Sequence, residues 1–248
     1  MWYSHLHYFL LHHNFQHDHS LLCIFILTEL SGFAIVAIYV DDINLVGTPT
    51  TCKKVVSLLT NRFEMKLLGK TTFCLGLQVA HLPDGSIFLH QTTYTQNLLE
   101  IFHMDQANPL SAPMIGRSRT FDDPYRPCEE EEEFYDKNKY LAAVGALLYL
   151  STYTRPDSSF ATSVLAKHSQ RPGVRHWNGV KHLFRYLRGT EDLGLHYTKE
   201  GASEIIGYAD AGFKSVEKSG RSQTGYIFLK NNAPISWKSM KQTLTAMR

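Results

Sequence analysis

The 248-residue sequence predicts an α+β fold, in which antiparallel hairpins alternate with helices and a short antiparallel meander follows. Three observations support this class. Residues 33–40 and 43–46 are apolar runs with almost nothing between them, which is typical of a β-hairpin. Residues 176–188 carry apolar side chains at helical spacing. Near the end of the sequence, three short apolar runs are separated by Gly, Ser and Asn, as the strands of a meander are.

Composition indicates a folded core and argues against a disordered chain. Hydrophobic residues make up 44% of the sequence, which is enough to form such a core. The formal net charge is only +2, which permits nucleic-acid binding without requiring it. The four cysteines form no CxxC pair, so they suggest neither a disulfide framework nor a zinc site, and they fit a reducing compartment. These cysteines are Cys23, Cys52, Cys74 and Cys128.

Neither an export signal nor a membrane span is expected from the sequence. The N-terminus is not basic and then apolar, as a signal peptide is. The most hydrophobic region, residues 21–40, is interrupted by Thr28, Glu29, Ser31 and Gly32, so neither half reaches the ~20 residues that span a bilayer. We therefore expect an intracellular protein, cytoplasmic or nuclear, that is neither secreted nor inserted in a membrane.

Residues 1–19 have apolar and aromatic side chains near helical spacing and predict a helix. Six of the thirteen histidines lie there: His5, His7, His12, His13, His17 and His19. His13 and His17 are four residues apart and would share a helix face, as a pair of metal ligands does. Because no HExxH pattern and no third ligand accompany them, a solvated histidine-rich face is favoured. A histidine-rich metal-binding protein is kept as an alternative from another class.

The first half of the chain is expected to contain two hairpins and two further helices. Residues 21–27 and 33–40 predict paired strands, and the second of these, which has no polar alternation, is expected to be buried on both faces. Residues 51–63 and 92–102 predict helices. Between them, residues 73–77 and 87–90 are expected to pair around the turn formed by Pro83, Asp84 and Gly85.

The second half is expected to be helical before the closing meander. Residues 116–139 include five successive glutamates, 129–133, and predict a solvated surface linker. Residues 140–150 are apolar nearly all round and predict a buried helix. A helix over 157–168 is expected to begin next to Pro156. The meander is predicted at residues 205–208, 225–229 and 234–237.

The helix predicted over 176–188 is amphipathic and carries a basic side. Lys181, Arg185 and Arg188 follow one another at four- and three-residue steps. Basic residues on one helix face supply most of the non-specific affinity for nucleic acid. An ordinary solvated face explains the same pattern equally well, so both interpretations stay open.

Asp41 and Asp42 are expected to lie at or beside the tip of the hairpin formed by residues 33–40 and 43–46. Neighbouring carboxylates repel each other, and next to buried strands they would also be partly desolvated. A divalent cation would explain the arrangement, because Mg²⁺ prefers oxygen ligands and is usually held by one or two carboxylates plus substrate phosphates. An aspartate pair that merely forms a turn is the alternative.

The tetrapeptide Tyr39-Val40-Asp41-Asp42, after a wholly apolar strand, resembles the active-site hairpin of reverse transcriptases. Its flanks, residues 38–49, resemble the copia-type branch of LTR retrotransposons. Residues 111–114 (SAPM) resemble the close of the copia-type palm, and residues 176–190 (HWNGVKHLFRYLRGT) resemble the segment between palm and RNase H. Residues 207–212 (GYADAG), 220–226 (GRSQTGY) and 235–237 (ISW) resemble the opening of a copia-type RNase H domain.

This resemblance implies a copia-type Pol polyprotein fragment in four parts. These are part of a reverse-transcriptase palm over residues 1–115, an acidic linker over 116–139, a helical thumb or connection over 140–198 and the first strands of an RNase H-like domain over 199–248. By resemblance, Asp41 and Asp42 would bind Mg²⁺ or Mn²⁺, Tyr39 would sit near the primer end, and Asp210 would be the first RNase H metal ligand. Lys70 would belong to a primer-gripping hairpin, and the partner would be an RNA/DNA template-primer.

The resemblance also implies that this chain alone is inactive. In reverse transcriptases a further aspartate lies upstream of the YxDD hairpin, and RNase H needs several more acids. We expect those parts to come from other Pol segments in cis or in trans. The alternative is a non-catalytic remnant that binds nucleic acid through Lys181, Arg185, Arg188 and the primer-grip-like hairpin. We also expect residues 205–248 to be marginally stable unless they pack on the helix that carries Trp177 or on a partner.

Overall fold

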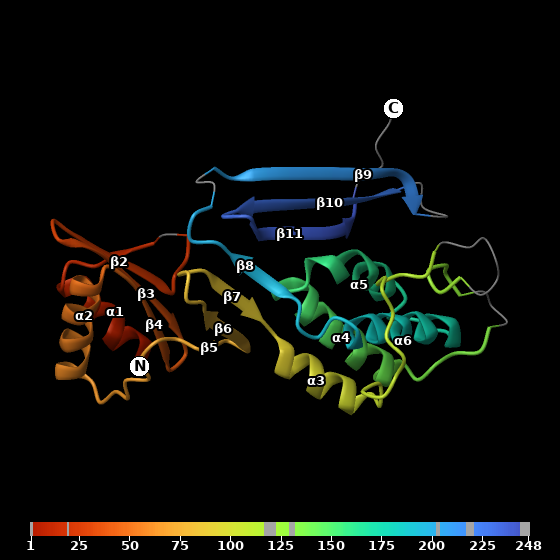
Figure 1. Cartoon of the computed structure of the whole chain (residues 1–248), viewed down its shortest axis with the longest axis horizontal. Helices are drawn as coiled ribbons and strands as arrows, with labels where there is room; N and C mark the ends of the chain where they lie inside the picture. The colour runs from red at the N-terminus through yellow and green to blue at the C-terminus, as the bar shows by residue number, and fades with distance from the viewer. Residues whose placement is uncertain are drawn as a thin grey trace. The chain divides into compact units, whose positions relative to one another are not determined.

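The computed structural model describes residues 2–18, 20–116, 123–128, 132–201, 204–216 and 221–243. It contains helices and three antiparallel sheets, which confirms the predicted α+β class (Figure 1). The chain divides into two compact units, residues 1–71 and 72–248. Among the described residues no helix is both long enough and apolar enough to cross a bilayer.

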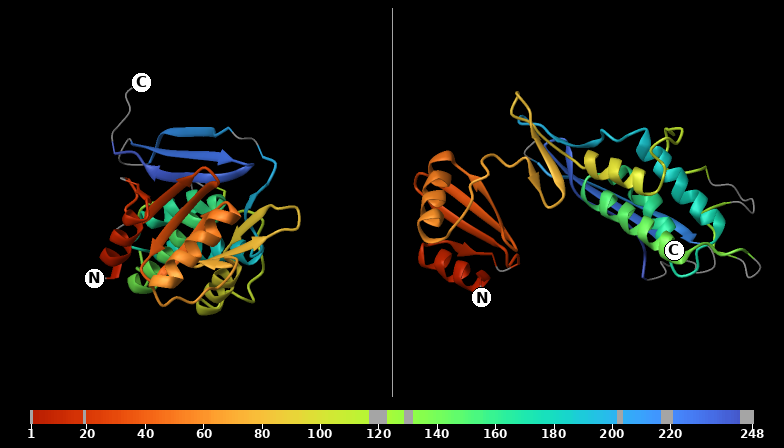
Figure 2. Two further views of the ribbon diagram at one scale, coloured as in Figure 1. Left: turned by 90° about the vertical axis from the view of Figure 1, so that its left-hand side faces the viewer. Right: turned by 90° about the horizontal axis from the view of Figure 1, so that it is seen from below.

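The first unit is a four-stranded antiparallel sheet, ordered β1-β2-β3-β4, with two helices on one of its faces (Figure 2). Its elements are α1 (Trp2–His12), β1 (Gln16–His17), β2 (Ile24–Glu29), β3 (Gly32–Tyr39), β4 (Asp42–Gly47) and α2 (Pro49–Arg62). The predicted hairpin of the two central strands and the second helix are therefore present. The strand expected over residues 21–27 starts later, because Asp18 forms a turn that occupies Ser20 and Leu21.

One face of the first sheet forms the core of the unit. Ala34, Val36 and Ile38 alternate along β3 and are at most 5% exposed. They pack with Leu6 and Leu10 of α1, Phe25 and Leu27 of β2, and Val55 and Leu59 of α2. The expectation that β3 is buried on both faces is wrong, since Phe33 and Tyr39 on its other face are 43% and 59% exposed. An apolar run without polar alternation does not reveal how many helices cover it.

The helix expected over residues 1–19 is shorter in the structure. It ends at His12, and Asn14 adopts a φ of 65°, which terminates the helix. His17 lies in β1 and pairs with Phe25 of β2, so His13 and His17 do not share a helix face. Nδ1 of His13 hydrogen-bonds to the carbonyl oxygen of Phe9 at 2.8 Å. Among the described residues no group of three His, Cys, Asp or Glu side chains could hold a metal ion.

The second unit begins with another four-stranded antiparallel sheet, ordered β5-β6-β7-β8. Its strands are β5 (Phe73–Cys74), β6 (Leu77–His81), β7 (Ile87–His90) and β8 (Gly194–Tyr197). The predicted turn is present, with Gly85 at a φ of 86°. The expected pairing of residues 73–77 with 87–90 is wrong, because β7 pairs with β6 and β5 pairs with the start of β6. The sequence analysis missed β8, which is only four residues long.

Four helices form the core of the second unit. They are α3 (Thr92–Ile101), α4 (Lys137–Tyr153), α5 (Ser159–Ala166) and α6 (Val174–Arg188), and a short 3₁₀ turn, η1 (Pro156–Ser158), precedes α5. The helices expected over 92–102 and 176–188 are confirmed. The core contains Leu98, Leu99, Tyr140, Leu147, Leu150, Leu165, Val180, Leu183, Phe184 and Leu187, all at most 4% exposed. The expectation that α4 is buried all round is wrong, because Leu141 and Leu148 are 42% and 41% exposed.

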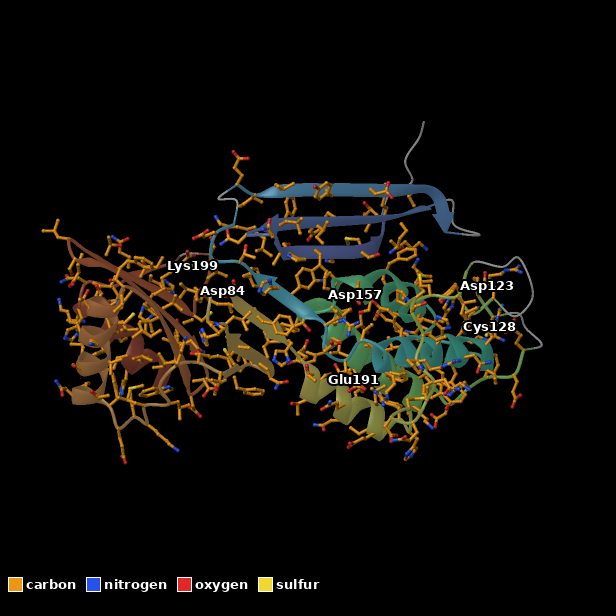
Figure 3. The ribbon with its side chains drawn as sticks, viewed as in Figure 1. Asp84, Asp123, Cys128, Asp157, Glu191 and Lys199 are labelled. Carbon is orange, nitrogen blue, oxygen red and sulfur yellow. The ribbon has the colours of Figure 1, made fainter. Side chains whose placement is uncertain are left out.

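The described part of the acidic linker packs against α6 at Glu132 and Tyr135, whereas Glu133, Phe134 and Asp136 are exposed, so the segment is solvated only in part. The carboxylate of Glu132 forms an ion pair with Arg175 at 2.6 Å, and both side chains are less than a tenth exposed. The ring of Tyr135 stacks on Trp177 with centroids 4.6 Å apart. Asp123 and Cys128 lie at this end of the unit (Figure 3). Glu129, Glu130 and Glu131, on which the prediction also rested, fall outside the described residues.

The closing meander is confirmed, with strands longer than expected. They are β9 (Ile206–Val216), β10 (Arg221–Lys230) and β11 (Ala233–Lys241), and β10 pairs with both neighbours. The sheet packs on α4 and α5, whereas the sequence analysis named the helix that carries Trp177, or a partner, as the possible support. The indole N–H of Trp237 donates to the carbonyl of Ser151 at 2.7 Å, and Gln223 bonds with Lys167 at 2.8 Å and Ser163 at 3.1 Å.

Two buried histidines stack face to face between α5 and α6. The rings of His168 and His176 are 3.9 Å apart and nearly parallel, at 8°. Nδ1 of His176 accepts a hydrogen bond from the Gly173 amide at 2.8 Å and Nε2 donates to the Arg126 carbonyl at 2.7 Å, so this ring is neutral. Burial, with the neighbouring His176, Arg175 and Lys167, lowers the pKa of His168 to about 3.

From the stacked pair of His168 and His176 we predict that the free energy of unfolding falls as the solution is acidified below pH ~6.5. The unfolded state takes up a proton on His168 in that range, whereas the folded state does so only near pH 3. The free energy of unfolding should therefore fall by about 1.4 kcal/mol per pH unit for this group. His168→Phe keeps the stack and should reduce the slope in urea unfolding. His196→Phe, at an exposed position, is the control, and an equal slope in all three proteins would contradict the prediction.

Candidate metal centre

The two adjacent acids lie at the tip of the β3–β4 hairpin, as the sequence predicts. Tyr39 pairs with Asp42 across the two strands, which leaves Val40 and Asp41 as the two-residue loop. Asp41 and Asp42 are both exposed. They are not desolvated by the strands, because the hairpin extends past Ile38, the last buried residue of β3. The tip is thus held by a packed sheet and presents its carboxylates to solvent.

The backbone at the tip is strained. Val40 has a φ of 53°, in the left-handed region that β-branched residues rarely adopt. Two-residue loops favour a positive φ at the first central position, where Gly is the usual residue. A side chain with a Cβ pays roughly 1–2 kcal/mol there. Strain of this size persists where the surrounding structure holds the backbone in place, and it gathers at functional sites.

The carboxylates of Asp41 and Asp42 differ from those of the turn-forming acids in this chain. Asp18, Asp84 and Asp136 each accept a hydrogen bond from the backbone N–H two residues further on, at 2.8–2.9 Å. Figure 3 labels Asp84, whose pKa lies below its usual range because Ser86 donates from both backbone and side chain. The carboxylates of Asp41 and Asp42 make no hydrogen bond or ion pair with the described residues. An aspartate that stabilises a turn accepts a hydrogen bond from a nearby backbone N–H. The side chains of Asp41 and Asp42 accept no such bond from the described residues, which argues against an ordinary turn.

The β3–β4 hairpin offers a cation two carboxylate ligands, those of Asp41 and Asp42. No group of three or more His, Cys, Asp or Glu side chains that could bind a metal is found in the described parts of the chain. Mg²⁺ and Mn²⁺ prefer oxygen ligands, and one or two carboxylates together with phosphate oxygens are a usual Mg²⁺ site. The exposed pair fits that ligand chemistry and leaves the remaining positions for water or phosphate.

The third predicted acid, Asp210, lies in the second unit. It sits in the interior of β9, opposite Gly225 of β10, and its side chain is exposed. The expectation that the strand ends before Asp210 is wrong, because Ala211 and Gly212 continue the pairing with β10. Asp210 lines a cavity of about 700 Å³ between the sheet and η1 and α5. The aromatic side chains at this cavity include Phe160, Tyr208 and Trp237.

Comparison with known proteins decides the family. A family model described as "Reverse transcriptase (RNA-dependent DNA polymerase)" matches residues 1–116. The chain is 34% identical over 221 residues, 88% of its length, to the retrovirus-related Pol polyprotein from transposon TNT 1-94 of Nicotiana tabacum. It is 32% and 31% identical over 242 residues, 97% of its length, to those from transposons RE2 and RE1 of Arabidopsis thaliana. The chain belongs to the copia-type retrotransposon Pol polyprotein family.

The chain spans about 16% of the length of each of these Pol polyproteins. No solved structure matches it. The hairpin that carries Asp41 and Asp42 falls within the reverse-transcriptase match, whereas Asp210 falls outside it.

The basic residues predicted to contact phosphate are partly engaged within the fold. Nε of Arg185 donates to the carbonyl of Asn108 at 2.7 Å, and Nε of Arg188 donates to that of Asp105 at 2.6 Å. Both arginines therefore fasten the loop after α3 to α6. Lys181 makes no hydrogen bond or ion pair with the described residues. Lys70 is exposed in the loop between α2 and β5.

Sequence reasoning missed one residue at the tip, Trp2. Its indole N–H donates to the carbonyl oxygen of Val40 at 3.3 Å, from the first turn of α1. The spacing of apolar residues identified Trp2 only as part of a helix face. No local signal connects it to a loop 38 residues further along the chain.

The strain at Val40 predicts that a residue suited to the left-handed region stabilises this chain. Val40→Asn should raise the free energy of unfolding by roughly 0.5–1 kcal/mol, because Asn adopts positive φ at lower cost. Urea unfolding measures the difference. Val46→Asn, at an exposed valine of β4 with extended backbone, is the matched control and should not stabilise. Equal effects of the two substitutions would contradict the assignment of strain to Val40.

Proposed function

We propose that Asp41 and Asp42 bind Mg²⁺ or Mn²⁺ in an RNA-directed DNA polymerase active site to which this chain contributes the acid hairpin. The observation that carries the proposal is that both carboxylates are exposed at a rigid hairpin tip and have no partner among the described residues. Among the described residues, four other aspartates, Asp18, Asp84, Asp123 and Asp136, bond their local backbone instead. The tip also lies inside the region that matches reverse transcriptases.

The hairpin would contribute ligands and orientation to the reaction. When bound, a pair of divalent cations stabilises the attacking and leaving oxygens of nucleotidyl transfer. Asp41 and Asp42 would each offer oxygens to such cations from one side. The buried face of β3 fixes their position, since Ala34, Val36 and Ile38 lock the strand into the core. Tyr39 is exposed directly opposite Asp42 and would sit beside a primer end, with an RNA/DNA template-primer as the partner.

This chain alone is proposed to lack polymerase activity. A two-metal centre holds two cations about 4 Å apart and needs carboxylates from more than one strand. Asp41 and Asp42 come from a single hairpin, and the described residues supply no third ligand beside them. Further Pol segments, in cis or in trans, would complete the centre. An intracellular location, cytoplasmic or nuclear, stays a prediction from the sequence.

The closing meander is proposed to be the start of an RNase H-like domain. The support is the sequence around Asp210 together with a three-stranded antiparallel sheet whose first strand carries that acid. Asp210 would serve as a metal ligand once further acids join it. The palm, thumb and RNase H assignments all belong to this proposal.

Primer extension and metal binding test the proposal together. On an RNA template with Mg²⁺, the chain alone should incorporate no nucleotide. In ¹⁵N NMR, Mn²⁺ should broaden the amide signals of Asp41 and Asp42, because a paramagnetic ion bound there lies close to them. Asp41→Asn with Asp42→Asn should remove this broadening, whereas Asp84→Asn, in the β6–β7 turn, should leave it unchanged.

Each outcome of that experiment decides one part of the proposal. Incorporation that Asp41→Asn abolishes would overturn the claim that the chain alone is inactive. Absence of Mn²⁺ broadening at the tip in the unchanged protein would overturn the metal role. Broadening that survives the double substitution would assign the ion to other residues.

A second proposal is that α6 contacts nucleic acid, and Lys181 is the residue that favours it. Lys181→Ala should weaken binding to an RNA/DNA duplex and lower the slope of log affinity against log salt by about one. Fluorescence polarisation at several salt concentrations measures this. Arg185→Ala should act mainly on stability, because it removes the donor to Asn108. An unchanged affinity in Lys181→Ala would leave α6 as an ordinary solvated helix.

A further inference from the structure

The carbonyl of Val40 at the hairpin tip receives a hydrogen bond from outside the hairpin. Its donor is the indole N–H of Trp2, at 3.3 Å. This carbonyl belongs to the peptide group that joins Val40 to Asp41. A peptide group is planar, so fixing its oxygen also fixes the direction in which the chain enters Asp41.

Trp2 is held in place by the first unit's aromatic and apolar contacts. Its ring meets Phe63 edge to face, with centroids 5.1 Å apart, and Phe63 in turn meets Phe9 at 5.0 Å. Leu6 and Leu10 anchor the same helix in the core and are fully buried. The donor therefore comes from a packed helix and not from a mobile side chain.

The tip needs such support, because its own backbone is unfavourable. The left-handed region in which Val40 lies is unfavourable for a β-branched residue, because its Cβ crowds the following carbonyl oxygen. A single hydrogen bond contributes a stabilisation of the same order as this strain. The indole contact therefore offsets much of the strain. Without it, the Val40–Asp41 peptide would be free to rotate toward conformations that valine prefers, and Asp41 would turn with it.

We infer that Trp2 is a positioning residue for the acid pair. Its indole N–H holds the Val40–Asp41 peptide in the orientation that presents Asp41 and Asp42 to one cation. Among the hydrogen bonds of the described residues, Trp2 reaches the carbonyl oxygen of Val40 and neither carboxylate, so it acts through the peptide. The inference rests on the proposed metal role of the hairpin and adds the residue that sets its geometry.

Trp2→Phe tests the inference, since it keeps an aromatic ring against Phe63 and removes the donor. Mn²⁺ titration followed by broadening of the Asp41 and Asp42 amide signals should show an affinity lowered roughly 3- to 10-fold. Tyr3→Phe is the matched control. It removes the hydroxyl that donates to the Leu22 carbonyl from the same helix, so it deletes a comparable bond that does not reach the tip. Its Mn²⁺ affinity should equal that of the unchanged protein.

A double-substitution cycle separates positioning from general loosening of the unit. Val40→Asn adopts the turn conformation at lower cost, so the effect of Trp2→Phe on Mn²⁺ affinity should shrink in that background. An equal effect in both backgrounds would show that Trp2 does not act through the strained peptide. Equal Mn²⁺ affinity of Trp2→Phe and the unchanged protein would overturn the inference directly.

The amide signals also distinguish this inference from the proposed function. If Mn²⁺ broadens nothing at the tip of the unchanged protein, the metal role fails. The positioning role is then read from the Asp41 and Asp42 amide chemical shifts without metal. Shifts that move in Trp2→Phe but not in Tyr3→Phe support it, and unmoved shifts overturn it.

Discussion

The candidate site depends on the register of β3 in the first sheet. Ala34, Val36 and Ile38 must face the helices, and this alternation fixes which residues pair across the hairpin. A slip of one residue would turn the buried set to the open face. It would also move the two-residue loop, so that the acids would no longer lie at the tip. The core packing of the first unit therefore determines the position of the Asp41 and Asp42 carboxylates.

The fold could be predicted from the sequence where its contacts are local. The β3–β4 hairpin has its two strands nearly adjacent in the chain, and α3 and α6 bury one face each in an obvious helical period. Prediction failed where the partner is distant. Strand β8 is four residues long and pairs with β7, which lies about a hundred residues earlier. Glu132 looked like part of a solvated acidic run because the sequence does not show that Arg175 meets it.

The candidate site, like the fold, could be predicted from the sequence only where its features are local. The two acids were found from the sequence, since they sit beside each other after an apolar strand. The left-handed backbone of Val40 and the hydrogen bond from Trp2 were not, because neither the φ angle nor a contact over 38 residues leaves a local pattern. The spacing of Arg185 and Arg188 shows a basic face. It does not show that the Nε groups of both arginines already donate hydrogen bonds to backbone carbonyls.

The tip of the first hairpin combines features that folding alone does not favour. The adjacent carboxylates of Asp41 and Asp42 repel each other, and Val40 adds a strained backbone. Neither carboxylate gains a hydrogen bond from the described residues in return. Asp84 shows that this chain can build a satisfied acidic turn, with Ser86 as the donor. Local conflict of this kind is expected at functional sites. A cation shared by both carboxylates, as proposed above, would turn their repulsion into attraction, and it would supply the favourable contact that the described residues do not provide.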